Sequence, residues 1–474
     1  MNDVVKLTAR QAVDLLKNKK VSPLELINAA LERIEQTDGA INALPTICAD
    51  RARQHAQRLM EMQSDNDTSR GQLHGLPVAI KDLKDVAGVR STRGSPIYAN
   101  HVPKTSDRLV TNIESRGGVV LAKSNTPEFG AGANTFNEVF GKTRNPWNTD
   151  LTCGGSSGGS GAALAAGQIW LATGSDLGGS LRIPASFCSV VGLRPTPGRV
   201  AHGPRADPYG TLSVEGPMGR NVGDVALLLD AQSGSYKWDP LSLPSPETSF
   251  VDSADTPAVP ARVAYTSNLG IATVDSSVVE VGRLAVSTFE GMGSRVDEAT
   301  IDLGDAEDTF QTLRGTQYVA GVGRLLADHR DLLKDEVIWN IEHGLSLTPE
   351  QIGLAEVARG GIINRTARFF ETYDVLVCPT VLTPPFDVDI RFLTEVEGVE
   401  LPTYIGWLLM TFALTLTGCP IISVPCGFTE SGLPVGVQIM APWKEEAYLL
   451  SVASAFEQEV GISESVPLEP RTSA

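Results

Sequence analysis

The N-terminal part of the chain has the hydrophobic periodicity and the capping residues of amphipathic helices. Residues 8–11 and 22–25 each place Thr or Ser three positions before Gln or Glu, which is the pattern of a capping box. In the second segment Pro23 occupies the first helical position, where proline is favoured. The apolar residues that follow recur at three- and four-residue intervals, so the sequence predicts an amphipathic helix from about Ser22 to Thr37.

Short apolar runs farther along the chain predict buried strands. Two of them flank a segment with a helical pattern: the runs are residues 76–80 and 118–122, and the helix is expected at 106–115. Further core strands are expected at residues 262–265, 375–377 and 421–424. A strand–helix–strand rhythm is typical of α/β layer architectures, so the fold class predicted from the pattern is α/β.

Three longer stretches complete the outline of the chain. Residues 308–372 predict mostly polar-faced helices, and the Pro- and Ser-rich residues 236–260 predict a surface loop. The apolar stretch 404–428 is interrupted by glycine and proline and lacks the run of about 18 apolar residues that a membrane span requires. It therefore predicts a buried helix followed by a core strand. Neither a repeat nor a long linker marks a boundary, so we expect one continuous α/β domain with a helical insertion.

Composition and charge narrow the function classes. The 474 residues are 42% hydrophobic and 20% charged, which excludes collagen-like, fibrous and disordered proteins. A formal net charge of −17 repels phosphate backbones and anionic lipid, so neither nucleic acid nor membrane is expected as a partner. The six cysteines include no C-x-x-C pair and predict neither disulfides nor a zinc site. No signal-peptide pattern begins at Met1, so we expect a cytoplasmic protein.

The first segment that carries chemistry is residues 153–161, where five glycines and three serines occupy nine positions. A flexible linker is the simplest interpretation of such a composition. However, an alanine-rich helix former follows directly, and glycines at a helix start expose backbone N–H groups that suit an anion or a developing oxyanion. No Gly-Lys-Ser/Thr follows, so the segment is not a phosphate-binding loop of the Walker type.

A second segment of the same kind covers residues 174–185. Gly178 and Gly179 allow a tight turn whose N–H groups converge near Ser180. Asp176 and Arg182 flank this turn with opposite charges, and the interpretation we favour is a pair that clamps the loop. An ordinary turn with a surface ion pair is the alternative.

A nucleophilic serine needs an adjacent base. None of the six histidines lies in a recognisable triad motif, and residues 154–158 match G-x-S-x-G without the strand that a nucleophile elbow requires. Lys81 follows the apolar run 76–80, where burial would disfavour its charged form and bring its pKa into range for proton transfer. A lone lysine after a strand is more often a surface residue, and only its combination with the two serine segments makes Lys81 a candidate.

The strings Gly75–Asp82, Gly154–Ser160 and Asp176–Ala185 together resemble the amidase signature family. Lys81 and Ser156 lie 75 positions apart, and Ser156 and Ser180 lie 24 apart, as in that family. Further matches are residues 192–196, 216–218, 378–380 and 433–438. The resemblance implies a three-layer α/β/α fold with a large mixed central sheet. It also implies a single domain over residues 1–474, with a variable, mainly helical substrate-pocket region at about 308–403.

The same resemblance implies a Ser–cis-Ser–Lys triad that uses neither a cofactor nor a metal. Ser180 would be the acylated nucleophile, Ser156 would relay the proton from a cis peptide after Gly155, and Lys81 would be the base. Backbone N–H groups would form the oxyanion hole, and they would come from Leu177, Gly178, Gly179 and Ser180.

Some positions depart from the family pattern or are tied to its variable region. Leu177 replaces the usual threonine, and Cys153 stands where proline is common; neither belongs to the triad. Thr415 replaces a frequent asparagine and is expected to alter the pocket wall. Three residues of one predicted helix are candidates for substrate binding, although core or surface roles are the alternative for each: Arg314, Gln317 and Tyr318.

The function expected from this resemblance is hydrolysis of a small aliphatic, aryl or amino-acid-derived amide, including oligomeric or cyclic ones. One alternative is a glutamine amidotransferase subunit that modifies mischarged tRNA, but residues 196–202 lack the tyrosine pattern of that branch and the net charge is strongly negative. Another alternative is a non-catalytic binding protein on the same fold. The sequence leaves the scissile bond and the oligomeric state open, and the frequent dimers of the family make a homodimer one candidate.

Overall fold

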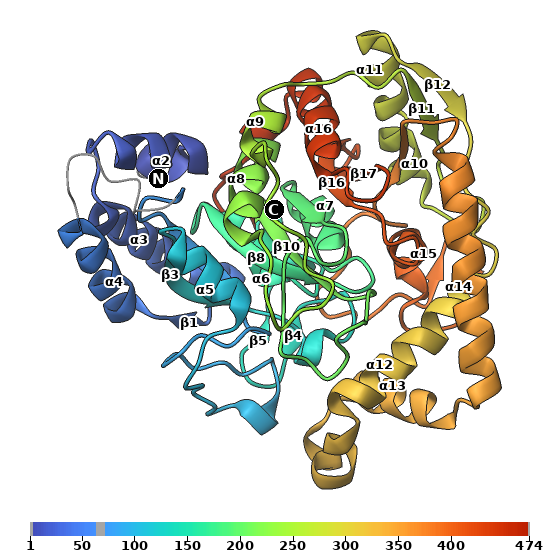
Figure 1. The fold of residues 1–474 in the computed structure, drawn as a ribbon, viewed down its shortest axis with the longest axis horizontal. Coiled ribbons are helices and arrows are strands. Elements are labelled where there is room, and N and C mark those ends of the chain that lie inside the picture. The colour runs from blue at the N-terminus through green and yellow to red at the C-terminus, as the bar shows by residue number, and fades with distance from the viewer. Residues whose placement is uncertain (1–2, 63–71, 473–474) are drawn as a thin grey trace.

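A large mixed sheet runs through the computed structural model, which describes residues 3–62 and 72–472 (Figure 1). Within these residues the sheet has 11 strands. In spatial order they are β1 (Thr46–Ile47), β3 (Val119–Ser124), β2 (Pro77–Lys81), β8 (Leu171–Asp176), β10 (Val214–Gly219), β9 (Val191–Arg194), β16 (Ile421–Phe428), β17 (Pro434–Met440), β13 (Val375–Pro379), β11 (Arg262–Tyr265) and β12 (Arg295–Glu298). The strands expected from the apolar runs are all present.

The sheet combines both strand directions, as the resemblance implied. β2 is parallel to β3 and to β8, and β13 is parallel to β11, which is parallel to β12. The five pairs from β8 through β10, β9, β16 and β17 to β13 are antiparallel, as is the pair of β1 with β3. Three short antiparallel ribbons lie outside this sheet: β4 (Phe136–Asn137) with β5 (Gly141–Lys142), β6 (Arg144–Asn145) with β7 (Asn148–Thr152), and β14 (Glu395–Val396) with β15 (Val399–Glu400).

Side chains of the central strands alternate between two separate cores, which is the direct sign of a sheet buried on both faces. In β13, Val375 and Val377 join one hydrophobic cluster, whereas Leu376 and Cys378 join another. Because successive side chains of a strand point to opposite faces, each cluster lies between the sheet and a helical layer. The predicted three-layer α/β/α architecture is therefore confirmed, and double burial explains why the strands read as continuous apolar runs.

Most helices form the two outer layers. The N-terminal helices are α1 (Asp3–Lys6), α2 (Ala9–Lys17), α3 (Pro23–Ile41), α4 (Ala49–Glu61) and α5 (Arg108–Ser115). Those that follow in the chain are α6 (Gly158–Ala165), α7 (Arg182–Cys188), α8 (Val222–Gln232), α9 (Phe250–Ala254), α10 (Ser276–Gly282), α11 (Leu284–Met292) and α16 (Glu446–Val460). α6 packs on α7, and α8 packs on α9 and α16; both groups contact the central strands β8, β10, β9 and β16.

Local sequence signals set the ends of several helices correctly. Both capping boxes are present, at Thr8 before α2 and at Ser22 before α3. Helix α3 continues past the expected end at Thr37 to Ile41, because the left-handed residue that ends it is Asn42. The sequence predicts that no signal peptide begins at Met1. Within this N-terminal segment, Met1 and Asn2 lie outside the residues that the structure describes.

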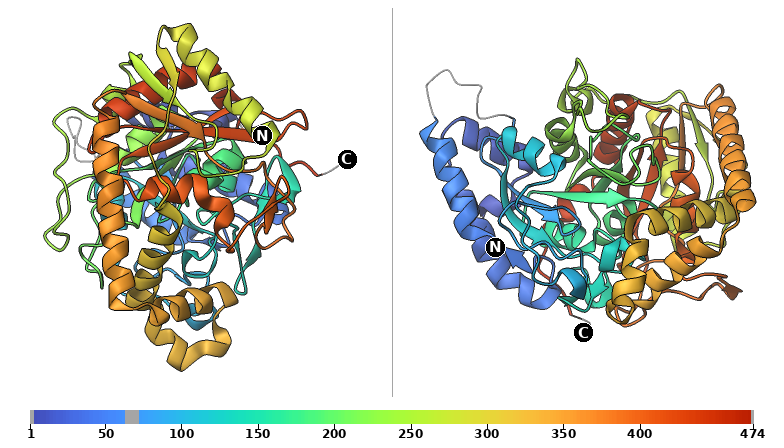
Figure 2. Two further views of the ribbon diagram at one scale, coloured as in Figure 1. Left: turned by 90° about the vertical axis from the view of Figure 1, so that its right-hand side faces the viewer. Right: turned by 60° about the horizontal axis from the view of Figure 1, so that its bottom comes forward.

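The segment 308–372 forms long helices, as predicted. They are α12 (Ala306–His329), α13 (Asp335–Ser346) and α14 (Pro349–Phe369), and they occupy the side of the molecule opposite the N-terminal helices (Figures 1 and 2). α12 contacts α13, α14 and also α15 (Leu409–Thr415). Strand β13 falls inside the region 308–403 and belongs to the central sheet, so that region is not purely helical. The extent of the variable region remains a prediction.

The prediction of a surface loop over residues 236–260 is wrong for one part of that segment. Ser249 caps a short helix, α9, in which Phe250 and Ala254 are buried among the apolar side chains of the main core. The capping serine and the apolar face that follows it are sufficient to form this short helix. The surrounding Pro-rich composition made this capping pattern hard to recognise in the sequence.

The apolar stretch 404–428 is a buried helix, α15, followed by the core strand β16, as predicted. Across the residues that the structure describes, no helix combines the length and the apolar character needed to cross a membrane. Short 3₁₀ turns complete the structure at η2 (Pro96–Tyr98), η3 (Glu128–Gly130), η4 (Arg330–Leu332), η5 (Gly406–Leu408) and η6 (Ser463–Ser465).

Candidate active site

Lys81 is the last residue of strand β2 and is almost fully buried, with 1% of its surface exposed. Its Nζ lies 2.7 Å from Ser156 Oγ, 2.9 Å from Ser157 Oγ and 2.9 Å from Ser175 Oγ. Its backbone N–H donates to Thr173 Oγ1, which fixes the end of the strand. The alternative of a surface lysine is therefore wrong, and Lys81 contacts both serine-containing segments that the sequence singled out.

Burial changes the acid–base character of this lysine. Desolvation lowers the pKa of Lys81 to about 7, although the carboxylates of Glu215 and Asp176 act in the opposite direction. A neutral amine has two N–H donors and one lone pair. Three hydroxyl oxygens surround Nζ, so the amine can donate to two of them and accept the proton of the third. A charged ammonium would instead donate to all three, and the role of Lys81 as the base remains a prediction.

The loop that presents Ser156 depends on glycine at close contacts. Gly154 has φ +71°, and the peptide between Gly155 and Ser156 is cis. A Cβ on Gly155 would lie 2.9 Å from Thr135 Oγ1, and one on Gly158 would lie 2.2 Å from the same atom. The glycines thus permit Thr135 to accept the N–H of Gly158 and to donate to the carbonyl of Gly154. A flexible linker is excluded, because this segment is buried and leads into α6.

Ser180 lies on the other loop, between β8 and α7, and lines the same cavity as Ser156. It is half-buried, and its carbonyl accepts the N–H of Ser157 at 3.2 Å, which ties the two loops together. Within the described residues, no hydrogen bond joins the Ser180 side chain to that of Ser156. The structure thus contains the Lys81–Ser156 contact, and the contact between Ser156 and Ser180 remains a prediction.

The backbone N–H groups around Ser180 separate into two sets. Leu177, Gly178 and Ser180 line the cavity, and in the described part of the chain their amides have no hydrogen-bond acceptor. Gly179 differs, because its N–H donates to Asp176 Oδ1 at 2.9 Å. Its φ is +122°, and a Cβ there would lie 2.3 Å from Thr411 Oγ1. Gly179 therefore shapes the turn, and its N–H is engaged by Asp176. The oxyanion-hole role of Leu177, Gly178 and Ser180 remains a prediction.

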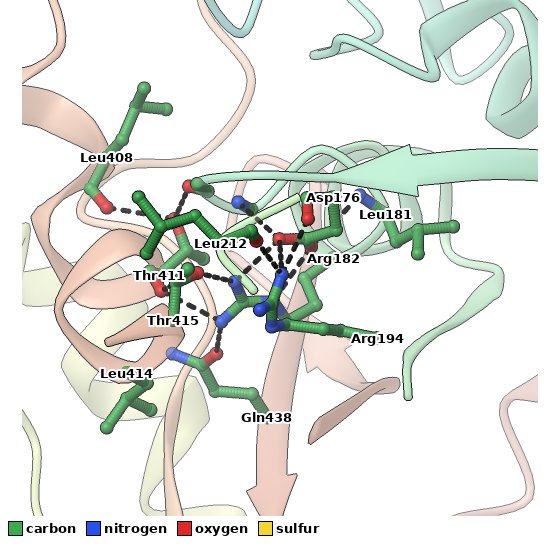
Figure 3. Close-up of polar contacts among 12 residues, drawn as sticks. Asp176, Leu181, Arg182, Arg194, Leu212, Leu408, Thr411, Leu414, Thr415 and Gln438 are labelled. Atoms are coloured by element: carbon green, nitrogen blue, oxygen red, sulfur yellow. Dashed lines mark hydrogen bonds and ion pairs between the residues drawn. The ribbon is translucent and has the colours of Figure 1, made fainter. Parts of the chain in front are cut away.

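Asp176 and Arg182 do form a pair, but it is fully buried rather than on the surface (Figure 3). Arg182 Nη2 lies 3.0 Å from Asp176 Oδ1, and Arg194 Nη1 lies 3.3 Å from the same oxygen. Burial alone would raise the pKa of Asp176, but the two guanidinium groups outweigh it and hold that pKa well below its usual range. Asp176 also accepts the N–H of Leu181, so the cluster fixes the loop that carries Ser180.

The other side of Arg182 reaches α15 and β17. It donates to the carbonyl of Thr411, to Thr415 Oγ1 and to Gln438 Oε1, each at 2.9–3.0 Å (Figure 3). Thr415 was expected to alter the pocket wall, and this expectation is wrong. Thr415 is fully buried, binds Arg182 and is not among the residues that line the cavity.

The cavity beside Ser180 has a volume of about 300 Å³. Arg314, Gln317 and Tyr318 line it from α12, as expected of the candidate substrate-binding residues. Their role in binding remains a prediction. The larger apolar side chains of the wall include Leu83, Phe129, Leu177, Phe310, Ile405 and Leu408.

Sequence reasoning missed several members of this site. Ser157 and Ser175 contact Lys81, and Arg194 is the second cation on Asp176. Ser157 and Arg194 lie inside strings that matched the family and Ser175 directly precedes one, but nothing local distinguishes a serine that faces the lysine from one that does not. Cys153 is buried, and desolvation raises the pKa of its thiol to about 12, so it is an inert neighbour.

No group of three or more His, Cys, Asp or Glu side chains in the described ranges is arranged to hold a metal ion. The six cysteines are free thiols, and five of them are buried.

Comparison with known proteins gives consistent relatives. The family model described as Amidase matches residues 25–450. An acylamidase of Rhodococcus erythropolis is 34% identical over 95% of both chains, and a glutamyl-tRNA(Gln) amidotransferase subunit of Halalkalibacterium halodurans is 33% identical over 94% of this chain and 95% of its own. Among solved structures, a bacterial aryl acylamidase belonging to the amidase signature enzymes superposes with a TM-score of 0.89 at 27% identity, covering 98% of this chain and 100% of that one.

Proposed function

This chain belongs to the amidase signature family, and we propose that it hydrolyses small carboxylic amides through an acyl-enzyme on Ser180. The observation that carries the proposal is the buried Lys81 Nζ, 2.7 Å from Ser156 Oγ in the cavity that Ser180 also lines. That the protein is an amidase acting on non-peptide amide bonds follows from its relatives. The proposal concerns the roles of its residues and the kind of amide.

Acylation would proceed by proton transfer along the three side chains. Ser180 Oγ attacks the amide carbonyl carbon and gives its proton to Ser156 Oγ, while Ser156 passes its own proton to the neutral Lys81 amine. The carbonyl oxygen becomes an oxyanion, which the N–H groups of Leu177, Gly178 and Ser180 stabilise. Removing one such donor typically costs about 3–4 kcal/mol in the transition state.

Collapse of this intermediate breaks the C–N bond. The leaving nitrogen takes a proton from the Lys81 ammonium through Ser156, and the amine or ammonia departs. Water then attacks the Ser180 ester, again losing its proton through Ser156 to Lys81. The bond between the acyl carbon and Ser180 Oγ breaks, and Lys81 returns the proton through Ser156 to Ser180 Oγ, so the products are the carboxylic acid and regenerated Ser180. Each turn of this cycle consumes one amide and one water and leaves the three side chains as they began.

The size and lining of the cavity support a small substrate. A volume of about 300 Å³ is at the lower end of ordinary ligand pockets, and much of its wall is apolar. Aliphatic, aryl and amino-acid-derived amides, linear or cyclic, fit this description. Cytoplasmic location and a homodimer remain predictions from the sequence.

A fluorophosphonate probe, which labels activated serines, tests the nucleophile. We expect Ser180→Ala to abolish both labelling and turnover across a panel of aliphatic, aryl and cyclic amides. Ser213→Ala serves as the matched control, because Ser213 lines the same cavity without contacting Lys81, and this variant is expected to stay labelled. Labelling that persists in Ser180→Ala would overturn the proposed nucleophile, and absence of labelling in the wild type would favour a binding protein.

The glutamine amidotransferase alternative has one observation in its favour, the 33% identity to the amidotransferase subunit of Halalkalibacterium halodurans. Such a protein is expected to hydrolyse glutamine, whereas a free-standing amidase cleaves other small amides without a partner. A glutaminase assay on the isolated chain, together with its native mass, distinguishes the two. If the isolated chain hydrolysed glutamine and none of the other amides, this alternative would replace the proposal.

A further inference from the structure

Arg314 is a buried cation in the wall of the proposed catalytic cavity. It lies on helix α12, exposes 4% of its surface and lines the same cavity as Ser156 and Ser180. Gln317 and Tyr318 follow one helical turn later on the same face of α12 and also line the cavity. The catalytic chemistry proposed above uses none of these three side chains.

All the close partners of Arg314 are uncharged. Nη1 donates to Asn340 Oδ1 at 2.5 Å, and Nη2 donates to the Tyr404 hydroxyl at 2.5 Å. The guanidinium also lies over the rings of Tyr318 and Tyr404, at 5.1 and 5.3 Å from their centroids. Burial raises the pKa of Tyr318, so its hydroxyl stays neutral and supplies no negative charge. Among residues 3–62 and 72–472, no carboxylate forms an ion pair with Arg314.

Most of the other buried arginines of the described chain have their charge paired with a carboxylate of the protein itself. Four of them form ion pairs with carboxylates: Arg33 with Glu469, Arg182 and Arg194 with Asp176, and Arg199 with Glu446. Arg220 donates to two backbone carbonyls, away from the cavity. Arg314 is thus the buried arginine that combines an unpaired charge with access to the proposed active site.

The charged groups near Arg314 do not compensate it. Glu336 is engaged by Arg391 at 2.7 Å, and Glu128 accepts from Ser95 Oγ and from the backbone N–H of Lys334. Lys334 and Arg391 are the cations that balance these two carboxylates, so the four groups together leave the charge of Arg314 uncompensated. Asp207 lines the cavity from the loop at residues 205–207 and makes no ion pair with Arg314 in the described structure. Keeping a cation buried without a counter-charge is unfavourable, and a ligand that brings the missing negative charge would relieve that cost.

We propose that Arg314 binds a carboxylate carried by the substrate. The substrate class is then an amide that has a free carboxylate at its other end, such as a half-amide of a dicarboxylic acid or an N-acylated amino carboxylic acid. Arginine suits this role because its planar group donates two parallel hydrogen bonds to a carboxylate. Gln317 and Tyr318 border the same position. The inference rests on the proposed function, since it names the substrates of that same site.

Two matched substrate pairs test this proposal, one for each side of the scissile bond. Glutaryl anilide and pentanoyl anilide differ by a carboxylate on the acyl side, and para-acetamidobenzoate and para-acetamidotoluene differ by one on the amine side. For at least one pair we expect a higher kcat/KM for the carboxylate-bearing member, and Arg314→Met should lower the ratio within that pair by about tenfold or more, mainly through KM. Arg314→Lys keeps the charge and should restore part of the ratio.

The control is Arg324→Met, which makes the same change at an exposed position of α12 and should leave the ratio as in the wild type. Equal losses for both members of each pair in Arg314→Met would overturn the proposal and assign Arg314 a structural role. A wild-type preference for the neutral member of both pairs would also overturn it.

A binding measurement keeps the proposal falsifiable if Arg314 variants fold poorly. Ser180→Ala retains Arg314, and we expect it to bind glutarate in isothermal titration calorimetry, with an affinity that falls as salt is added. Absence of glutarate binding would overturn the subsite. If the wild type instead hydrolyses no amide of these pairs or of the substrate panel, while glutarate binds to the wild type but not to Arg314→Met, the proposed function fails and the carboxylate subsite stands.

Discussion

The acid–base state of Lys81 can be tested through the pH dependence of the reaction. Burial lowers the pKa of Lys81 to about 7, and the lysine must be neutral to accept a proton. About half of the enzyme is then competent at pH 7, about a tenth at pH 6 and about a hundredth at pH 5. A lysine with the ordinary pKa of about 10.4 would be neutral in fewer than one molecule in a thousand at pH 7. We therefore expect kcat/KM to rise tenfold per pH unit up to about pH 7 and to level off above it.

Glu215→Gln is expected to move the acidic limb of this pH profile, the range in which kcat/KM rises with pH, in a defined direction. The Glu215 carboxylate raises the pKa of Lys81 more than any other charge, and it is paired with Lys84, whose Nζ lies 2.6 Å away. Replacing Glu215 by glutamine removes this negative charge and leaves the positive charge of Lys84, which lowers the pKa of Lys81. Both effects have the same sign. A nearby charge shifts a pKa by roughly one unit or more, so the acidic limb should move to lower pH by about one unit.

The assay is kcat/KM from initial rates between pH 5 and pH 9.5 at constant ionic strength, with the best amide from the substrate panel, because kcat/KM reports ionisations of the free enzyme. Glu350→Gln makes the same change at an exposed position on α14 and should leave the limb in place. The reasoning is refuted if the wild-type profile is flat down to pH 5, if activity begins only near pH 10, or if Glu215→Gln moves the limb upward.

Three further changes test other parts of the structure. For Lys81→Met we expect loss of turnover and a change in the pH dependence of stability. Between pH 7 and about 10.5 the unfolded wild type binds a proton on Lys81 that the folded state does not hold, so the unfolding free energy of the wild type rises by up to about 5 kcal/mol over this window. Urea unfolding should show this rise in the wild type and not in the variant. Asp176→Asn leaves two buried guanidinium groups without a counter-charge and should cost about 3–5 kcal/mol of unfolding free energy. Asp331→Asn makes the same change at an exposed position and should leave stability unchanged. Equal urea-unfolding midpoints for the two variants would contradict this account. Cys153→Ala should retain activity, and wild-type Cys153 should resist alkylation below about pH 9, because burial raises its pKa to about 12; rapid labelling of this thiol in the folded protein would show that the account of its surroundings is wrong.

Much of the fold was predictable because its signals are local. Capping residues at Thr8 and Ser22 fixed two helix starts, and the apolar runs before Lys81 and at residues 421–424 identified strands of the central sheet. These signals depend on neighbours within a few positions of the chain. The short helix α9 was missed because a single capped turn at Ser249 is too brief to stand out from a Pro-rich context.

The candidate site was predictable to the extent that its motifs are contiguous. The strings around Lys81, Ser156 and Ser180 carry the resemblance to the family, and the structure brings the first two into contact. The resemblance treats all four N–H groups of the turn alike, whereas the structure directs that of Gly179 to Asp176. The difference arises from the position of a side chain three residues earlier, which a one-dimensional pattern does not specify.

The amino-acid order alone thus determined most of the elements, the layered class of the fold and which side chains are candidates for the reaction, since each depends on periodicity or on a short run of residues. Only the tertiary structure decided which serines meet Lys81, that Asp176 has two cations, and that Arg314 has no acid beside it. These contacts join segments tens to hundreds of residues apart. Their distances, and the burial that sets their charge states, arise from how the sheet and helices pack, and no local pattern contains that information.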